Sequence, residues 1–278
     1  MRINKFISET GVCSRREADQ WITAGRVSCN GAPATLGTRV AAGDVVLVDG
    51  QPLRERRVPV YLALNKPVGI VSTSEPEVVD NIVDFVGYPE RIFPVGRLDK
   101  DSEGLILLTN DGDIVNRILR AENNHEKEYL VSVDRPLTEM TLAIMRSGVR
   151  IMGEMTRPCR VDRIDERSFR IVLTQGLNRQ IRRMCSALGY KVRRLRRVRI
   201  GEVHLGTLAP GRWRHLSAQE VAAFLPGDPA QSDRKPADSR SASALTPSVQ
   251  ARPTAARQSG SSALRASHRK KSGPWPAQ

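Results

Sequence analysis

Residues 58–225 contain short apolar segments of strand character that often follow one another with no helix between them. Helical patterns interrupt this succession at 113–120, 138–146 and 178–188. Parallel strands need long crossover connections, usually helical, whereas antiparallel strands can follow one another through short turns. The succession therefore predicts an α+β domain built on a mostly antiparallel sheet.

The strands expected in this domain are short runs of aliphatic and aromatic residues. They are predicted at 61–64, 69–72, 105–109, 128–133 and 169–173, and later strands carry Val192, Leu195, Val198 and Ile200. Ser217 and Glu220 have the spacing of a capping box, in which each side chain binds the other residue's backbone N–H. This pair predicts a last helix near the end of the domain.

A separate, smaller domain is predicted at residues 1–57. Ser14 followed by Glu17 has the capping-box spacing and predicts the second of two short helices. Turn sequences at 30–31 and 49–50 then separate small strands. Cationic residues lie mostly outside the apolar face, and we expect five of them to bind RNA: Arg2, Lys5, Arg15, Arg16 and Arg26.

The last segment, 226–278, differs from the rest in composition. Ala, Ser, Pro and Arg dominate it, and nine Lys or Arg stand against three Asp. Such a segment has too few apolar residues to build a core, so we predict a disordered basic tail. It is either a solvated tail or a flexible arm that raises affinity for RNA without specificity.

The charge of the whole chain indicates a polyanionic partner. Lys and Arg number 44 against 30 Asp and Glu, which gives a formal net charge of +14. Binding a nucleic acid with such residues is favourable because each neutralised phosphate releases condensed counterions. The alternative is that the charge only keeps the protein soluble.

Neither a metal site nor membrane insertion is indicated. The four cysteines form no C-x-x-C pair, and no histidine lies at metal-ligand spacing from any of them. The N-terminal residues lack the apolar core of a signal peptide, and no run approaches the length of a membrane span. We therefore expect a cytoplasmic protein that binds no metal and no membrane.

The most specific pattern lies at residues 94–111, which read P-V-G-R-L-D-K-D-S-E-G-L-I-L-L-T-N-D. On physical grounds it is a Gly-punctuated acidic loop that leads into a buried strand. It resembles the signature G-R-L-D-x-x-S-x-G-L of the pseudouridine synthases that modify the small- and large-subunit ribosomal RNAs.

Two further segments resemble this family in the expected order, and a third resembles a separate RNA-binding domain. Residues 127–131, K-E-Y-L-V, resemble its K-x-Y-x-V strand. Residues 175–184, Q-G-L-N-R-Q-I-R-R-M, resemble its G-[RK]-x-H-Q-[IV]-[RK]-R-M element, although Leu177 replaces a basic residue and Arg179 replaces histidine. Residues 2–31 resemble the alpha-L RNA-binding domain named after the fourth small-subunit ribosomal protein.

The resemblance implies three catalytic residues, Asp99, Tyr129 and Arg182. Asp99 would supply the nucleophilic carboxylate, and Arg182 is expected to pair with it and favour its ionised form. Tyr129 would offer an aromatic face to the uracil and a hydroxyl for removing the C5 proton. Without the resemblance, Tyr129 would be read as an ordinary core residue.

Further RNA contacts are expected around this site, at Arg97, Arg179, Arg183, Arg193 and Arg194. From Arg179 to Arg199 the chain carries nine Lys or Arg and no carboxylate. Apolar residues interleave with these charges, so one side is expected to pack while the other faces the RNA backbone. The alternatives are a solvated face for the charge run and a structural ion pair for Arg97. Arg182 is expected to face Asp99, and Arg183 to lie nearer the surface, because successive helical residues diverge by about 100°.

The resemblance implies that the chain isomerises a specific uridine in folded large-subunit (23S) ribosomal RNA to pseudouridine. The reaction breaks the N1–C1′ bond, turns the uracil and rejoins it through C5, so it involves no redox change and needs no nicotinamide, flavin or other cofactor. The chain also lacks dinucleotide-binding and P-loop glycine patterns. The alternative substrates are small-subunit ribosomal RNA and transfer RNA. A non-catalytic RNA-binding or ribosome-assembly factor is the alternative class, and we expect a monomer.

Overall fold

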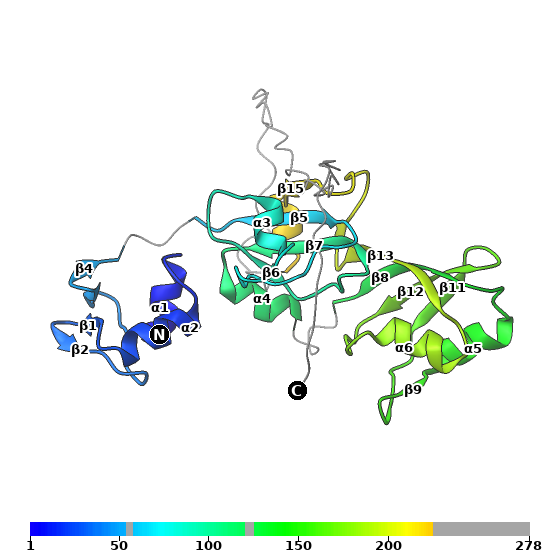
Figure 1. Cartoon of the computed structure of the whole chain (residues 1–278), viewed down its shortest axis with the longest axis horizontal. Coiled ribbons are helices and arrows are strands. Elements are labelled where there is room, and N and C mark those ends of the chain that lie inside the picture. Colours follow the sequence, from blue (N-terminus) through cyan, green and yellow to red (C-terminus); the bar gives the residue numbers. More distant parts are fainter. Residues whose placement is uncertain (54–57, 120–124, 225–278) are drawn as a thin grey trace, which may run out of the picture.

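The computed structural model describes residues 1–53, 58–119 and 125–224. The N-terminal unit lies to one side of a larger body that contains a long sheet (Figure 1). The predicted boundary at residues 57 and 58 falls next to a stretch outside the described residues, and the predicted tail at 226–278 lies outside them altogether.

The N-terminal unit has the two short helices and small strands that its sequence predicts. Helices α1 (Ile3–Glu9) and α2 (Arg15–Thr23) pack beside a four-stranded sheet. At the start of α2, the Glu17 amide donates to the Ser14 hydroxyl at 3.1 Å and the Ser14 amide donates to the Glu17 carboxylate at 2.7 Å, which confirms the capping box. The sheet order is β2 (Ala32–Pro33), β1 (Val27–Cys29), β3 (Val46–Val48) and β4 (Gln51–Pro52).

The larger body is built on a sheet whose main path has seven strands. Their order is β11 (Arg160–Arg163), β12 (Ser168–Leu173), β8 (Lys127–Val133), β13 (Val192–Ile200), β7 (Glu103–Thr109), β5 (Tyr61–Lys66) and β15 (Trp213–His215). Two short strands join it at the side, with β6 (Phe93–Val95) pairing β7 and β14 (Val203–His204) pairing β13. All these pairs are antiparallel except β13 with β7, so the predicted α+β class with a mostly antiparallel sheet is confirmed.

The parallel pairing of β13 with β7 depends on a glycine. Gly104 in β7 lies opposite Arg197 in β13 and has φ +103°, a conformation that residues with a side chain rarely adopt. A Cβ atom at this position would overlap the carbonyl oxygen of Arg197. The absence of a side chain is therefore what lets the two central strands approach.

Within the described residues, five helices and one short hairpin complete the body. On the β8–β12 half of the sheet, α5 (Glu139–Ser147) and α6 (Gln180–Ala187) share one apolar core with the strands, and the hairpin of β9 (Arg150–Ile151) and β10 (Glu154–Met155) extends from this half. The β5–β7 half is packed on both faces. Leu62 and Ile106 pack with α3 (Ile82–Val86), whereas Ala63 and Leu105 pack with α4 (Gly112–Leu119); α7 (Ala218–Ala222) follows the last strand.

Two details differ from the sequence expectation. The strand expected at 69–72 is wrong, because these residues form a turn with only an isolated bridge between Val71 and Asn81. Gly69 has φ +97°, which turns the chain away from an extended path. The later strand positions from Val192 to Ile200 belong to one nine-residue strand, β13.

Candidate active site

The loop that carries Asp99 joins β6 to β7 and is fixed by its neighbours; we call residues 98–102 the Asp99 loop. Leu98 donates its amide to the Ser72 hydroxyl oxygen at 3.2 Å and accepts a hydrogen bond from that hydroxyl at 2.8 Å. The Ser102 amide donates to the Asp99 carbonyl at 3.0 Å. The backbone on both sides of Asp99 is therefore held, while its side chain remains 30% exposed.

A buried lysine supports the Asp99 loop from the side of β5. Lys66 has no exposed surface, and its ammonium donates to two backbone carbonyls of the following turn at 2.9 Å each. In that turn the Gly69 amide donates to the Lys100 carbonyl of the Asp99 loop at 2.8 Å. Burial lowers the pKa of Lys66 to about 8, because the charged form is poorly solvated there.

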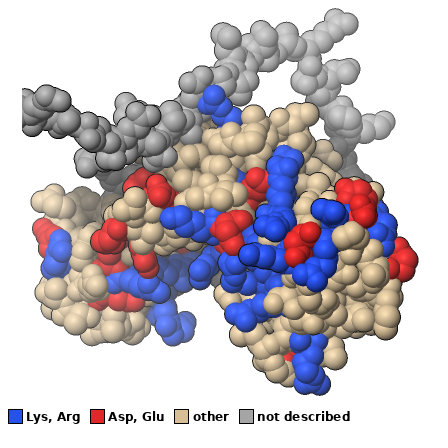
Figure 2. All heavy atoms as spheres, turned by 45° about the vertical axis from the view of Figure 1, so that its right-hand side comes forward, with Lys and Arg blue, Asp and Glu red and all other residues tan. Residues whose placement is uncertain are grey.

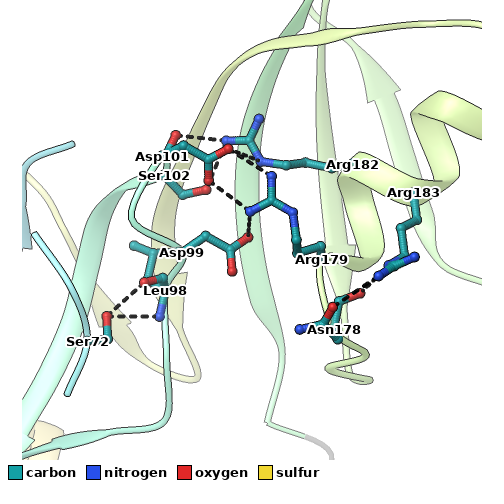
Figure 3. A network of polar contacts seen from close by, with 9 residues as sticks. All are labelled: Ser72, Leu98, Asp99, Asp101, Ser102, Asn178, Arg179, Arg182 and Arg183. Atoms are coloured by element: carbon teal, nitrogen blue, oxygen red, sulfur yellow. Dashed lines mark hydrogen bonds and ion pairs between the residues drawn. The ribbon is translucent and has the colours of Figure 1, made fainter. Parts of the chain in front are cut away.

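Arg179 forms the ion pair with Asp99. Its Nη1 lies 3.3 Å from Asp99 Oδ2, and its guanidinium donates to both carboxylate oxygens of Asp101, at 3.1 and 2.8 Å (Figure 3). The hydrogen bond from Arg179 is the main cause that lowers the pKa of the Asp101 carboxyl. One guanidinium thus joins the two carboxylates of the Asp99 loop.

Arg182 contacts the neighbours of Asp99 instead of Asp99 itself. Its Nη2 donates to the Asp101 carbonyl at 2.8 Å and to the Ser102 hydroxyl at 3.0 Å, and its Nε lies 3.4 Å from the Asp101 carboxylate. The expected Arg182–Asp99 pair is therefore wrong. The side chain of Arg182 is only 15% exposed, and it anchors the backbone of the Asp99 loop.

The start of α6 explains why Arg179, and not Arg182, contacts Asp99. The sequence predicts a helix from Asn178, but the helix begins at Gln180 and is preceded by Arg179 in the left-handed region, with φ +51°. That turn lets Arg179 reach the Asp99 loop alongside Arg182 (Figure 3). Arg183 is exposed and donates to the Asn178 carbonyl at 3.0 Å, so its expected position nearer the surface is confirmed.

A cavity of about 700 Å³ lies beside Asp99. Its walls come from the Asp99 loop, from β8 and β13, and from residues 173–182. Tyr129 is half-buried on β8 and lines this cavity together with Asp99 and Arg182, so the three residues predicted as catalytic share one site. Arg97 is exposed and lines the same cavity.

The structure adds cavity residues that sequence reasoning did not single out. Lys127 on β8 and Arg197 on β13 both line the cavity, and Arg197 is only 4% exposed. Lys127 belongs to the K-x-Y-x-V pattern, so its position carried a signal. Arg197 lies within the basic run 179–199, in which the interleaved apolar residues are expected to pack and the cations to face the RNA backbone.

The other residues predicted to bind RNA lie mostly on the outside. Figure 2 shows Lys and Arg side chains gathered in a band across one face, around a hollow. Arg193 and Arg194 are exposed on β13, and Arg194 forms an ion pair with Glu103.

In the N-terminal unit the predicted RNA-binding residues fall into two groups. Two already have protein partners: Arg26 pairs with Asp49, and Lys5 pairs with Asp113 of α4 at 2.6 Å, which links the two units. The others are exposed: Arg2, Arg15 and Arg16.

In the parts of the chain that the structure describes, none of the helices has the length and apolar character needed to cross a membrane. Across those same ranges, His, Cys, Asp and Glu side chains form no group of three or more that could hold a metal ion.

Comparison with known proteins agrees with this geometry. Residues 60–187 match the family of RNA pseudouridylate synthases, and residues 1–46 match the S4 domain. A solved structure described as a pseudouridylate synthase is 31% identical and superposes with a TM-score of 0.60, covering 81% of this chain and all of that one.

The curated relatives have the same activity in their names. The dual-specificity RNA pseudouridine synthase RluF of Escherichia coli (strain K12) is 56% identical over 80% of this chain and 77% of that protein. The ribosomal large subunit pseudouridine synthase B of Bacillus subtilis (strain 168) is 35% identical over 79% of this chain and 93% of that protein. With an S4 domain at its N-terminus and the Asp99 cavity in its larger body, the chain belongs to the RNA pseudouridine synthases, which isomerise uridine in RNA to pseudouridine.

Proposed function

We propose that this enzyme converts a specific uridine of folded large-subunit (23S) ribosomal RNA to pseudouridine, with Asp99 as the nucleophile. The observation that carries the proposal is the position of the Asp99 carboxylate, which lines a cavity of about 700 Å³ on a loop held from both sides. A carboxylate fixed in this way can attack a nucleotide that has been extracted from its stack.

The reaction places clear demands on the groups around the nucleotide. The N1–C1′ bond breaks, a C5–C1′ bond forms, the C5 proton leaves, and N1 gains a proton. A carboxylate that bonds transiently to the nucleotide divides this exchange into easier steps. Arg179 Nη1 lies 3.3 Å from Asp99 Oδ2 and so places a positive charge beside the nucleophile.

Tyr129 serves in this proposal as the surface on which the uracil lies. It lines the cavity with Asp99, and its hydroxyl is the group that takes part in removing the C5 proton. Its half-buried position leaves part of the side chain available to a ligand.

Arg182 serves as a positioning residue. It binds the Asp101 carbonyl and the Ser102 hydroxyl, and through them it fixes the turn that presents Asp99. This role replaces the direct ion pair that the sequence suggested.

We assign RNA binding to both folded units. Residues 1–57 form one domain and 58–225 the catalytic domain, with 226–278 as a basic tail. The RNA backbone follows exposed cations from Arg2, Arg15 and Arg16 to Arg97, Arg183 and Arg193. The enzyme acts as a monomer in the cytoplasm.

The names of the relatives support ribosomal RNA as the substrate. The protein from Bacillus subtilis is named for the large ribosomal subunit, and the one from Escherichia coli is named as having dual specificity. The second substrate we consider is transfer RNA.

The experiment that tests the substrate is a map of pseudouridines in cells with and without this gene. Carbodiimide modification followed by primer extension is read on both ribosomal RNAs and on transfer RNAs. We expect at least one large-subunit site to disappear and to return when the wild-type gene is restored. Loss of sites in small-subunit ribosomal RNA or transfer RNA alone would contradict the proposed substrate.

A further inference from the structure

Arg197 is a buried cation with an unused hydrogen-bond donor. Its Nε donates to the Leu105 carbonyl at 2.6 Å, and its Nη1 reaches the Arg97 carbonyl at 3.4 Å. Its Nη2 is buried and has no hydrogen-bond partner among residues 1–53, 58–119 and 125–224. A buried donor without a partner costs free energy, so its retention calls for an explanation.

The register of the sheet places Arg197 beside the proposed base-binding tyrosine. Arg197 in β13 lies opposite Tyr129 in β8, and both line the cavity. Residues directly opposite each other in an antiparallel pair have Cβ atoms about 4.5–5.5 Å apart, so their side chains are neighbours. A uracil that lies on the ring of Tyr129 would therefore meet Arg197 at one of its edges.

Lys127 adds a second cation to the same face of the sheet. It lies two residues before Tyr129 in β8, so both side chains are on one face, and it also lines the cavity. Its ammonium donates to the His125 carbonyl at 3.2 Å, and within the described parts of the chain no carboxylate forms an ion pair with Lys127 or with Arg197. Burial, and secondly the charge of Arg197, lower the pKa of Lys127.

Arg197 and Lys127 together suit a ligand that accepts hydrogen bonds and gains negative charge during the reaction. Uracil has two carbonyl oxygens, O2 and O4, and a guanidinium has only donors. When the N1–C1′ bond breaks, its electron pair stays on the ring and is delocalised over these oxygens. That electron pair then forms the C5–C1′ bond, after which C5 loses its proton and N1 gains one.

We propose that Arg197 donates a hydrogen bond to a carbonyl oxygen of the target uracil and, together with Lys127, stabilises the negative charge that the ring carries during isomerisation. Fixed cations aimed at developing charge in a site that excludes water lower the barrier without reorganising. The proposal rests on the synthase activity and on Tyr129 as the surface that holds the base.

The test uses the full chain and three stem-loop RNAs that carry the mapped uridine, which wild-type protein converts. The first contains the normal uridine, the second 2-thiouridine and the third 4-thiouridine at that position. Sulfur accepts hydrogen bonds more weakly than oxygen. Single-turnover rates at saturating RNA are measured for wild type, Arg197→Met and a matched control, Arg196→Met, whose side chain leaves the same strand on the opposite face.

We expect Arg197→Met to lose about 10²-fold in rate on the normal RNA, as for removal of an oxyanion-hole donor. Arg196→Met should stay near wild type. One of the two thio substrates should slow wild type by about tenfold, equivalent to about 1.4 kcal/mol, and this effect should vanish in Arg197→Met. RNA affinity should remain within about threefold, because the contact is made to the base and not to a phosphate.

A sulfur effect of equal size in wild type and in Arg197→Met would overturn the proposal, and so would a loss confined to RNA affinity. If thermal melting shows that Arg197→Met is unfolded, Arg197→Lys and the wild-type thio series decide. If wild type converts both thio substrates as fast as the normal RNA, the enzyme makes no rate-determining contact to either carbonyl oxygen of the uracil, and the proposal fails. Because the uridine used is one that wild type converts, none of these results bears on the choice of RNA.

Discussion

Arg179 Nη1 lies 3.3 Å from Asp99 Oδ2, whereas Arg182 binds the carbonyl and hydroxyl of the two residues that follow Lys100 in the loop. The arginine in direct contact with the nucleophile is thus the more exposed one, at 40%, and the one that anchors the loop is 15% exposed. The two contacts should respond differently to mutation.

Arg182→Met is expected to slow the chemical step by about 10²-fold, because a loop displaced by about 1 Å no longer presents its nucleophile correctly. Arg179→Met should cost less than about tenfold, since partly exposed ion pairs contribute about 0–1 kcal/mol. Arg183→Met should be mild in rate and act on RNA affinity. Single-turnover kinetics at saturating RNA measures all three, and equal losses for Arg182→Met and Arg183→Met would show that the loop anchor is unimportant.

Lys66 should make the stability of the enzyme depend on pH. Its pKa in the folded protein is about 8, below the usual 10.5, so folding disfavours its protonated form. This penalty is fully present below pH 8 and is relieved as the pH rises toward 10.5, so this group makes the folded state relatively more stable at high pH. The full difference is about 3 kcal/mol.

The measurement compares urea unfolding of wild type and Lys66→Met at pH 7 and pH 10. Methionine removes the titrating group, so wild type should gain stability relative to the variant as the pH rises. If the difference in unfolding free energy between wild type and Lys66→Met is the same at both pH values, Lys66 titrates normally.

Gly104 should tolerate no side chain. Alanine there would overlap the backbone of Arg197 and would adopt an unfavourable φ, so Gly104→Ala is expected to destabilise by more than about 4 kcal/mol or to prevent folding. Gly176→Ala is the matched control, because an added Cβ at Gly176 meets nothing within 4 Å. Thermal melting that places both variants close to wild type would contradict the close approach of β7 and β13.

Removal of residues 1–57 should weaken RNA binding while the remaining domain folds. Three apolar cores lie within residues 60–224, and a separate one lies within the N-terminal unit. We expect the dissociation constant for the stem-loop to rise by at least about tenfold, about 1.4 kcal/mol, with the rate at saturating RNA little changed. Filter binding against a salt series measures it. If the truncated protein bound the stem-loop with the same dissociation constant and the same salt dependence as the full chain, residues 1–57 would have a function other than RNA binding.

The sequence predicted the parts of the fold that depend on local patterns. The capping boxes at Ser14 and Ser217, the buried strand at 105–109 and the helix after Thr138 all depend on neighbours a few residues apart, and the structure has them. The strand expected at 69–72 is replaced by a turn at Gly69, which has φ +97° and follows the buried Lys66. Its burial depends on two carbonyls that become available only when the chain folds back.

The candidate site was predicted less completely than the fold. Motif positions brought Asp99, Tyr129 and Arg182 into one cavity, but the pairing within it depends on the left-handed residue Arg179, which no helical periodicity reveals. The inward position of Arg197 was likewise not predictable from the local sequence pattern. In a strand rich in arginine, the sheet register decides which side chain turns inward.

Asp99→Asn gives the most direct test of the central claim, that the Asp99 carboxylate attacks the nucleotide. The amide keeps the shape of the side chain but cannot act as the nucleophile, so we expect no pseudouridine after single-turnover incubation with the stem-loop, with RNA affinity within about threefold of wild type. Pseudouridine formed by Asp99→Asn at a rate near that of wild type would contradict the assignment of Asp99.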